Sequence, residues 1–277
     1  MQILKGTGEY EEFNPEKLKE SLLRVSTSLL TAKDVVEKVM PKVKEGMTTD
    51  EIYKIAFQIL NKNEKKSAMR YSMKRSILEL GPTGFPFEKF IAEIFRKKGY
   101  QAETGIMLPG SCVYHEVDLL AYDEEDLIIG EVKFHNALHL KSDTKTALYV
   151  KARWDDLKDK EIITENNEHR KPTRCILITN TKFTHNSEKY AKCVGLGMIS
   201  WGYPKKGNLY DLIFETKLHP VTVVHSLSNY EKELLIKNDI ITANQIIDKP
   251  FKLKELGFKN SEILKIVAEA KIVCDLV

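Results

Sequence analysis

The stretch His115–His135, HEVDLLAYDEEDLIIGEVKFH, decides the fold of the central part of the chain. Two apolar runs in it are separated by four consecutive acidic residues, and side chains alternate between the two faces of a strand. Pairing the runs around positions 124 and 125 brings Val117 against Val132 and Ala121 against Ile128. The stretch therefore predicts an antiparallel hairpin with one continuous apolar face.

The opposite face of this hairpin carries charge. The same register places Asp118 across from Glu131, and Glu116 across from Lys133. Directly opposed Cβ atoms lie roughly 4.5–5.5 Å apart, and opposed like charges cost stability. A divalent cation would remove that cost, whereas the simpler alternative is a solvated sheet face with a Glu116–Lys133 ion pair, which would be nearly neutral in energy.

Composition limits the classes of protein to consider. The chain has 277 residues, of which 30% are charged, and a formal net charge of +3, which is compatible with nucleic acid as a partner without requiring it. The sequence contains no apolar run long enough to span a membrane, and acidic residues stand where a signal peptide would be apolar. Four scattered cysteines without a CxxC pair indicate neither a zinc site nor a disulfide framework, so we expect a cytoplasmic protein.

Three segments follow from the pattern of helices, strands and breaks. Residues 1–82 read as a small hairpin followed by a helical bundle, and Gly81-Pro82-Thr83-Gly84 marks its end. Residues 83–218 alternate helix and strand, as in a mixed α/β layered domain, and residues 219–277 form short amphipathic helices. We expect strands over 2–4, 10–13, 175–179 and 197–201, and helices from Asn14, after Thr31, from Thr48, and over 67–80, 144–157, 187–194, 230–237, 242–247 and 261–271.

The middle segment resembles a nuclease family in the order of its charged residues. Glu88 lies in a predicted helix within Phe-Glu-Lys-Phe, Asp118 follows on a strand, and Glu131-Val-Lys133 stands on the next strand. Together with the downstream block over 176–201, ILITNTKFTHNSEKYAKCVGLGMISW, this set resembles the Mrr-type restriction endonucleases of the PD-(D/E)xK superfamily. The resemblance implies a restriction-endonuclease-like mixed sheet flanked by helices.

The resemblance also implies a reaction, the hydrolysis of DNA phosphodiester bonds with Mg²⁺ or Mn²⁺ as cofactor. Asp118 and Glu131 would hold the metal ion, Lys133 would assist the nucleophile, and Glu88 would be an outer ligand or would orient water. Magnesium commonly takes one or two protein carboxylates, with water and substrate oxygens completing its shell. The alternative for Glu88 is an ordinary exposed helix residue, with Glu93 as its nearest competitor.

A predicted helix after this set carries basic residues around an aromatic one: Lys145, Tyr149, Lys151 and Arg153. Such a face suits a phosphate backbone, so we expect it to contact DNA. The alternative is a solvated helix face. His115 and His135 bracket the predicted site, either as lining residues or as ordinary loop histidines.

The first segment resembles an ATP-cone, the small nucleotide-sensing domain known from ribonucleotide reductases and their transcriptional repressor. The resemblance is carried by three short stretches, Ile-Leu-Lys-Gly-Thr-Gly over 3–8, Glu-Phe-Asn-Pro-Glu-Lys-Leu over 12–18, and Ala-Met-Arg-Tyr over 68–71. It implies a regulatory ATP or dATP whose phosphates contact Lys5 and Lys17, next to a helix N-terminus that suits an anion. The alternative is a helical domain that serves only for packing.

These features predict a Mg²⁺-dependent DNA endonuclease of the Mrr-like restriction type, regulated by ATP or dATP. Cleavage of both strands would suggest a homodimer, and no membrane is expected as a partner. Two alternatives remain open, a non-catalytic nucleotide-responsive DNA-binding protein on a nuclease fold and a structure-selective Holliday-junction-type resolvase. The last segment is similar to helix-hairpin-helix bundles and would serve DNA contact, protein docking or packing.

Overall fold

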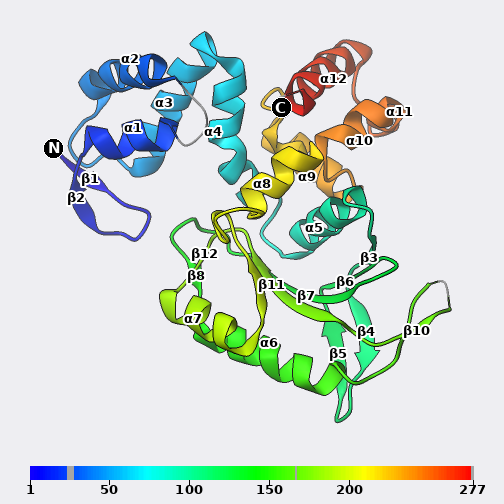
Figure 1. Cartoon of the computed structure of the whole chain (residues 1–277). Helices are drawn as coiled ribbons and strands as arrows, with labels where there is room; N and C mark the ends of the chain where they lie inside the picture. Colours follow the sequence, from blue (N-terminus) through cyan, green and yellow to red (C-terminus); the bar gives the residue numbers. More distant parts are fainter. Residues whose placement is uncertain (24–27, 166, 276–277) are drawn as a thin grey trace.

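A central five-stranded mixed sheet organises the molecule, in a computed structural model that describes residues 1–23, 28–165 and 167–275 (Figure 1). The strand order is β13-β11-β7-β6-β3, with β13, β11 and β7 parallel and with β6 and β3 antiparallel to their neighbours. The strands span β3 (Gln101–Glu103), β6 (Leu119–Tyr122), β7 (Leu127–Lys133), β11 (Arg174–Thr179) and β13 (Gly197–Ile199). The expected mixed α/β architecture is therefore confirmed.

The pairing of β6 with β7 confirms the central part of the predicted hairpin. Ala121 lies opposite Ile128, and Leu119 lies opposite Gly130. All four residues of β6 and the first four of β7 are buried, because helices cover both faces of the sheet. The acidic residues between the two strands form the connecting turn, in which Asp123 Oδ1 accepts hydrogen bonds from the backbone N–H groups of residues 125 and 126.

The predicted hairpin pairing is wrong for the residues that precede Asp118. Val117 ends a separate strand, β5 (Tyr114–Val117), which pairs with β4 (Ile106–Pro109) instead of continuing along β7. Val117 and Val132 consequently belong to different apolar clusters on opposite faces of the sheet. The change occurs where backbone pairing of β6 with β7 ends, since the Asp118 carboxylate accepts the Val132 N–H at 2.7 Å.

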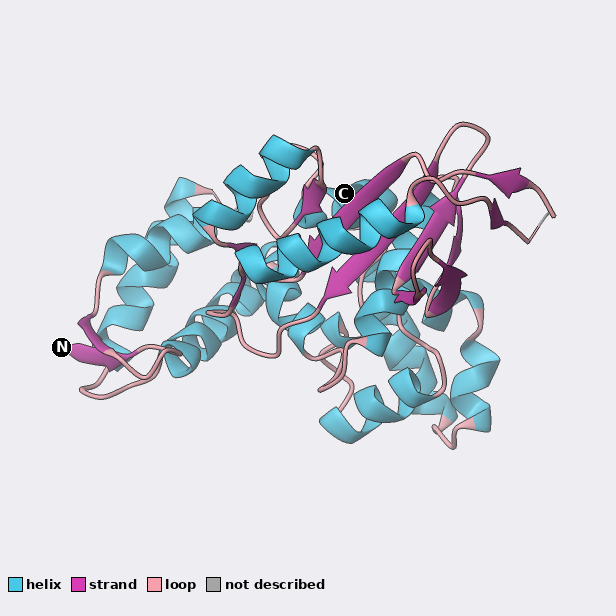
Figure 2. Cartoon of the chain, turned by 90° about the horizontal axis from the view of Figure 1, so that it is seen from below, coloured by secondary structure: helices cyan, strands magenta, loops and turns pink. Residues whose placement is uncertain are grey.

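Helices cover both faces of the sheet. On one face lie α5 (Phe85–Lys97) and α8 (Leu209–Thr216), and on the other lie α6 (Thr144–Leu157) and α7 (His185–Val194) (Figure 1). Seen from below, α6 and α7 lie in front of the strands (Figure 2). The predicted bounds of α6 are reproduced, and α7 begins two residues earlier than expected, because Thr184 caps it through the Ser187 N–H.

The first segment forms the expected hairpin and helical bundle. Strands β1 (Gln2–Leu4) and β2 (Tyr10–Glu12) pair antiparallel, and the four helices are α1 (Pro15–Leu23), α2 (Leu29–Val39), α3 (Thr49–Asn63) and α4 (Lys65–Leu78). Helix α2 begins before Thr31, because Ser28 caps it by accepting the Thr31 N–H. A reciprocal capping box between Thr48 and Glu51 starts α3 where the sequence predicted.

Helix α4 belongs to two apolar cores at once. Ala68 packs into the core of the first segment. Met69, Met73 and Ile77 instead join the large cluster that includes α5, one face of the sheet and the C-terminal helices. Helix α4 therefore connects the apolar core of the first segment to that of the rest of the chain.

The C-terminal helices share this same large cluster. They are α9 (Asn229–Lys237), α10 (Ala243–Asp248), α11 (Pro250–Glu255) and α12 (Asn260–Cys274). Three of them match predicted helices, whereas α8 and the six-residue α11 were not predicted. The remaining short elements are β8 (Lys141–Ser142), β9 (Ile162–Ile163), β10 (His169–Arg170), β12 (Lys182–Phe183) and the 3-10 helices Met40–Lys42 and Val221–Val223. Within the described residues, no helix has both the length and the apolar character needed to cross a bilayer.

Gly130 provides a test of the β6–β7 packing. A Cβ atom there would lie 2.9 Å from Cβ of Leu119 on the opposite strand, so Gly130→Ala should lower the free energy of unfolding by about 1–3 kcal/mol. Gly202→Ala is the matched control, because a Cβ at Gly202 meets no atom within 4 Å. Urea unfolding of both variants compares the two costs, and equal stability would contradict the register described here.

Candidate functional site

The four residues predicted to be catalytic line one cavity. Its volume is about 400 Å³, and Glu88, Asp118, Glu131 and Lys133 all contribute to its wall. The other lining residues come from the turn before α5, from β7 and from the chain that follows it, namely Pro82, Gly84, Val132, Phe134, His135 and Asn136. The structure therefore brings together residues that are up to 45 positions apart in the sequence, counted from Glu88 to Lys133.

Each side chain reaches the cavity for a local structural reason. Glu88 lies in the first turn of α5, directly after the turn that contains Gly84. Asp118 stands between β5 and β6, where the chain changes pairing partner. Glu131 and Lys133 alternate with Val132 near the end of β7, so both project to the same side of the strand.

The environment of the cavity disfavours the ionised form of its carboxyl groups. Burial, together with the nearby charges of Asp118, Glu116 and Glu131, raises the pKa of Glu88 to about 7, and burial is the largest cause. Burial also raises the pKa of Asp118, although the Val132 N–H and Arg153 oppose that shift. The pKa of Glu131 is raised by burial and by the charge of Asp118.

Arg153 is the main counter-charge to this cluster. Its guanidinium donates to Glu131 Oε2 at 2.5 Å and to the Tyr149 hydroxyl at 2.7 Å, and it also lies 4.8 Å from the centre of the Tyr149 ring. The side chains of Arg153 and Glu131 are only 9% and 16% exposed. A buried ion pair of this kind is costly to break, because it leaves one charge without a partner.

The predicted DNA-contacting helix face is thus divided by the fold. Lys145 and Tyr149 are exposed on α6, and Lys151 is partly exposed and pairs with Asp155 at 2.5 Å. Arg153 is instead buried and pairs with Glu131 of the acidic cavity, so it is not part of an exposed phosphate-binding face. This placement corrects the grouping of Arg153 with the other three.

The cavity offers fewer protein ligands for a metal ion than a complete protein metal site has. Among the described residues, no three His, Cys, Asp or Glu side chains form a group that could hold a metal ion. Mg²⁺ needs only one or two carboxylates when substrate and water supply the rest. Asp118 and Glu131, the two carboxylates predicted for this role, line the same cavity, and the charge of Asp118 adds to burial in raising the pKa of Glu131.

The alternatives considered for neighbouring residues are now resolved. The ion pairs of the described residues include none between Glu116 and Lys133, and Glu93 pairs with Arg96 outside the cavity. His115 hydrogen-bonds Asp156 of α6 at 2.8 Å. His135 does line the cavity, and its ring contacts Ser142 at 2.9 Å.

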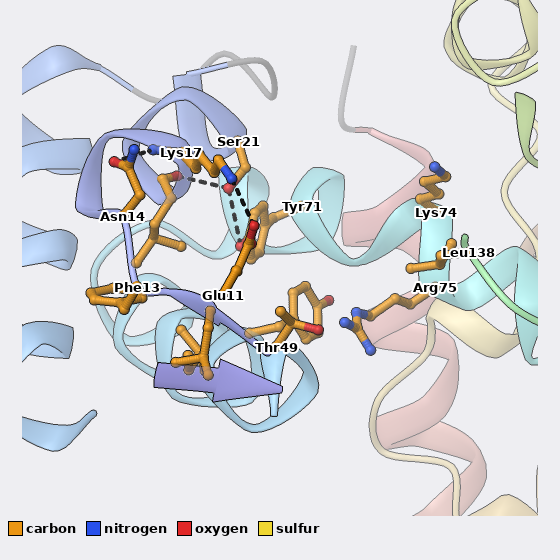
Figure 3. A pocket seen from close by; sticks show the side chains of 14 residues that line it. Glu11, Phe13, Asn14, Lys17, Ser21, Thr49, Tyr71, Lys74, Arg75 and Leu138 are labelled. Atoms are coloured by element: carbon orange, nitrogen blue, oxygen red, sulfur yellow. Dashed lines mark hydrogen bonds and ion pairs between the residues drawn. The ribbon is translucent and has the colours of Figure 1, made fainter. Parts of the chain in front are cut away.

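A second cavity, of about 380 Å³, lies in the first segment (Figure 3). Phe13, Asn14 and Lys17 stand on one side, at the N-terminus of α1, where Asn14 Oδ1 accepts the backbone N–H of Glu16 at 2.9 Å. An apolar or aromatic wall, a cation and a helix N-terminus together suit a nucleotide.

The two predicted nucleotide-binding lysines are joined by one carboxylate. Glu11 Oε2 lies 3.0 Å from the ammonium of Lys17 and 3.7 Å from that of Lys5. Lys17 lines the cavity, whereas Lys5 lies outside the set of described lining residues and also pairs with Glu9. Lys5 therefore reaches this site through Glu11 rather than directly.

Sequence reasoning did not assign the aromatic wall of this cavity. Tyr53 and Tyr71 stack with their ring centres 4.9 Å apart, and the Arg75 guanidinium lies 3.8 Å from the centre of the Tyr53 ring. Tyr71 belongs to a stretch that carried the ATP-cone resemblance, but Tyr53 lies on a different helix. No local pattern connects these positions, because only the packing of α3 against α4 brings them together.

Comparisons with known proteins agree with part of this picture. Residues 1–78 match the ATP cone domain family, and residues 219–274 match the family described as AF1548-like, C-terminal. A relative from Archaeoglobus fulgidus, described as an uncharacterized protein, is 28% identical over 181 residues, which cover 65% of this chain and 98% of the relative. A crystal structure described as that of a protein of unknown function, AF1548, superposes with a TM-score of 0.56 at 26% identity, and covers 69% of this chain and 98% of its own.

The expected ATP-cone is thereby confirmed for residues 1–78. Its presence supports nucleotide binding in the first segment. The C-terminal match and the two relatives carry no stated activity. The nuclease assignment, its residues and its metal ion therefore stay predictions.

The raised pKa of Glu88 makes stability depend on pH. Between pH 4.5 and about 7 the folded state retains a proton that the unfolded state releases, so the free energy of unfolding falls as pH rises through this window. Glu88→Gln should be more stable than the wild type above pH 7, on the order of 1 kcal/mol after solvent screening of this half-buried group, and equal to it below pH 4.5. Thermal unfolding at several pH values measures this, and the same pH trend for the control Glu93→Gln would contradict it.

The Arg153–Glu131 pair makes a separate prediction. Arg153→Met should destabilise the fold by about 3 kcal/mol, because it leaves Glu131 without its buried partner, and adding Glu131→Gln should recover much of that loss. Lys151→Met is the control on the same helix, since its more exposed pair with Asp155 is worth less than about 1 kcal/mol. Urea unfolding of these three variants and of Glu131→Gln alone measures the costs, and additive effects in the double variant would exclude the coupling.

Proposed function

We propose that this protein is a Mg²⁺-dependent DNA endonuclease whose activity responds to ATP or dATP. One observation carries the proposal: Glu88, Asp118, Glu131 and Lys133 line a single cavity of about 400 Å³. Glu88 lies on α5 and Glu131 and Lys133 lie on β7, as the PD-(D/E)xK resemblance implies, whereas Asp118 lies between β5 and β6 rather than on a strand. Lys133, which lines this cavity, is exposed to solvent.

The residues divide the chemistry among them. Asp118 and Glu131 would hold Mg²⁺, which when bound supplies Lewis acidity and a more acidic water. Lys133 places a positive charge beside both carboxylates, where it steadies negative charge that develops on the phosphate. Glu88, a half-buried carboxylate in the wall of the same cavity, would accept a proton from the attacking water.

The contact of Arg153 with Glu131 favours a second candidate function. This guanidinium already neutralises one of the two carboxylates proposed to hold the metal ion. A protein that binds DNA in response to nucleotide, without cleaving it, would retain such a pair. A carboxylate has two oxygens, however, and Arg153 contacts Oε2, so the pair is also compatible with a cation on the other side of Glu131.

Plasmid cleavage with Mg²⁺ tests the proposal. The wild type should nick supercoiled DNA, Asp118→Asn should reduce nicking to background, and Glu88→Gln should slow it by about a hundredfold, because the variant loses the proton acceptor. Glu93→Gln is the control, since this residue of α5 pairs with Arg96 outside the cavity. Each reaction is run with ATP, with dATP and without nucleotide.

Each outcome of this experiment decides between the candidates. DNA binding without nicking under any of the three conditions would favour the non-catalytic function. Unchanged nicking by Asp118→Asn would exclude the assigned site. A preference for branched over linear duplex substrates would identify a junction resolvase with the same chemistry, and cleavage of both strands at one position would support a homodimer.

A further inference from the structure

The chain that follows β7 connects the two cavities. Lys133 through Asn136 line the acidic cavity, and Leu138, only two residues further on, lines the cavity of the ATP-cone. In Figure 3, Leu138 lies beside Lys74 and Arg75, across the cavity from Asn14 and Lys17. The cone cavity is therefore walled partly by a residue from outside the cone.

Leu138 lies at the tip of a tight turn. The Leu140 N–H donates to the Ala137 carbonyl at 3.2 Å, which places Leu138 and His139 at the two central positions of the turn. A Cβ atom at Gly6 would lie 3.4 Å from Nδ1 of His139, so this turn also contacts the loop between β1 and β2. Leu138 and His139 therefore both lie against the cone.

One end of the turn is fixed at the end of β11 in the central sheet, and the other end belongs to a separate two-stranded sheet. The backbone N–H of His135 donates to the Asn180 side chain at 2.8 Å, and the Asn180 amide donates back to the His135 carbonyl at 2.8 Å. On the other side, β8 pairs with β12. Residues 136–140 therefore form a short bridge that is anchored to strands at both ends and lies against the cone at its tip.

We propose that residues 136–140 complete the nucleotide site, with Leu138 as a direct contact to the nucleotide, and that an occupied site orders Asn136 in the wall of the acidic cavity. This inference rests on the proposed nucleotide binding by the cone and names how that binding reaches the acidic cavity. The expected ligand is a nucleotide such as ATP, whose apolar parts suit Leu138 and the tyrosine wall. The phosphates suit the cationic side at Lys17.

Hydrogen–deuterium exchange on the full chain tests the ordering. ATP should slow exchange of the amides of residues 136–140 in the wild type, because a bound nucleotide removes opening motions of the turn. Lys17→Ala, which weakens the cone site, should lose this protection at the same ATP concentration. Equal exchange with and without ATP in the wild type would overturn the inference.

Two leucine variants test the direct contact. Leu138→Ala should weaken ATP binding about fivefold, because it removes part of an apolar wall. Leu140→Ala removes the same atoms from the same bridge, but Leu140 is not one of the described residues that line either cavity, so its affinity for ATP should equal that of the wild type. Calorimetric titration measures both affinities, and equal affinities of the two variants would overturn the inference.

These readouts separate the inference from the endonuclease proposal, since neither depends on cleavage. ATP protection of 136–140 in a chain that nicks no DNA would support the inference and overturn the nuclease. DNA cleavage with no ATP effect on 136–140 would overturn the inference alone. If the protein cleaves DNA, Leu138→Ala should reduce the difference between its cleavage rates at saturating ATP and without nucleotide.

Discussion

The position at which β6 stops pairing with β7 determines the geometry of the acidic cavity. Leu119 opposite Gly130 is the last backbone pair, and the next residue back along the chain, Asp118, uses its carboxylate to accept the Val132 N–H at 2.7 Å. This single hydrogen bond fixes a carboxylate beside Glu131 and Lys133 while β5 turns away to pair with β4. Had the hairpin continued, a backbone carbonyl rather than this carboxylate would have accepted the Val132 N–H.

The carboxylates of the acidic cavity lie beside positively charged side chains. Three carboxylates are held where burial and mutual repulsion favour protonation, and Arg153 on α6 and Lys133 on β7 offset part of that repulsion. Arg153 is itself positioned by the Tyr149 hydroxyl at the surface of α6. The exposed face of α6 is thus linked by one guanidinium to Glu131 in the wall of the acidic cavity.

Much of this arrangement was predictable from the sequence, and the errors have specific physical causes. Alternation along β6 and β7 predicted Ala121 opposite Ile128 and placed Glu131 and Lys133 on one side. The break at Asp118 was not predictable, because a side chain that replaces a strand partner leaves the apolar pattern of the following residues unchanged. Arg153 has the same spacing from Tyr149 as an exposed helix residue would have, and only its packing against the sheet reveals that it is buried. The contribution of Leu138 to the cone cavity depends on how two distant parts of the chain dock, about which local patterns carry no information.

Helix α4 connects the ATP-cone to the rest of the chain. Its Ala68 belongs to the core of the ATP-cone, whereas Met69, Met73 and Ile77 belong to the core that contains the sheet and the C-terminal helices. A fragment ending at residue 78, where the ATP-cone match stops, would carry these three apolar side chains into water. Such a fragment would tend to self-associate along α4, so the cone of this protein is not a module that can be grafted onto another chain without also supplying a surface to cover that helix.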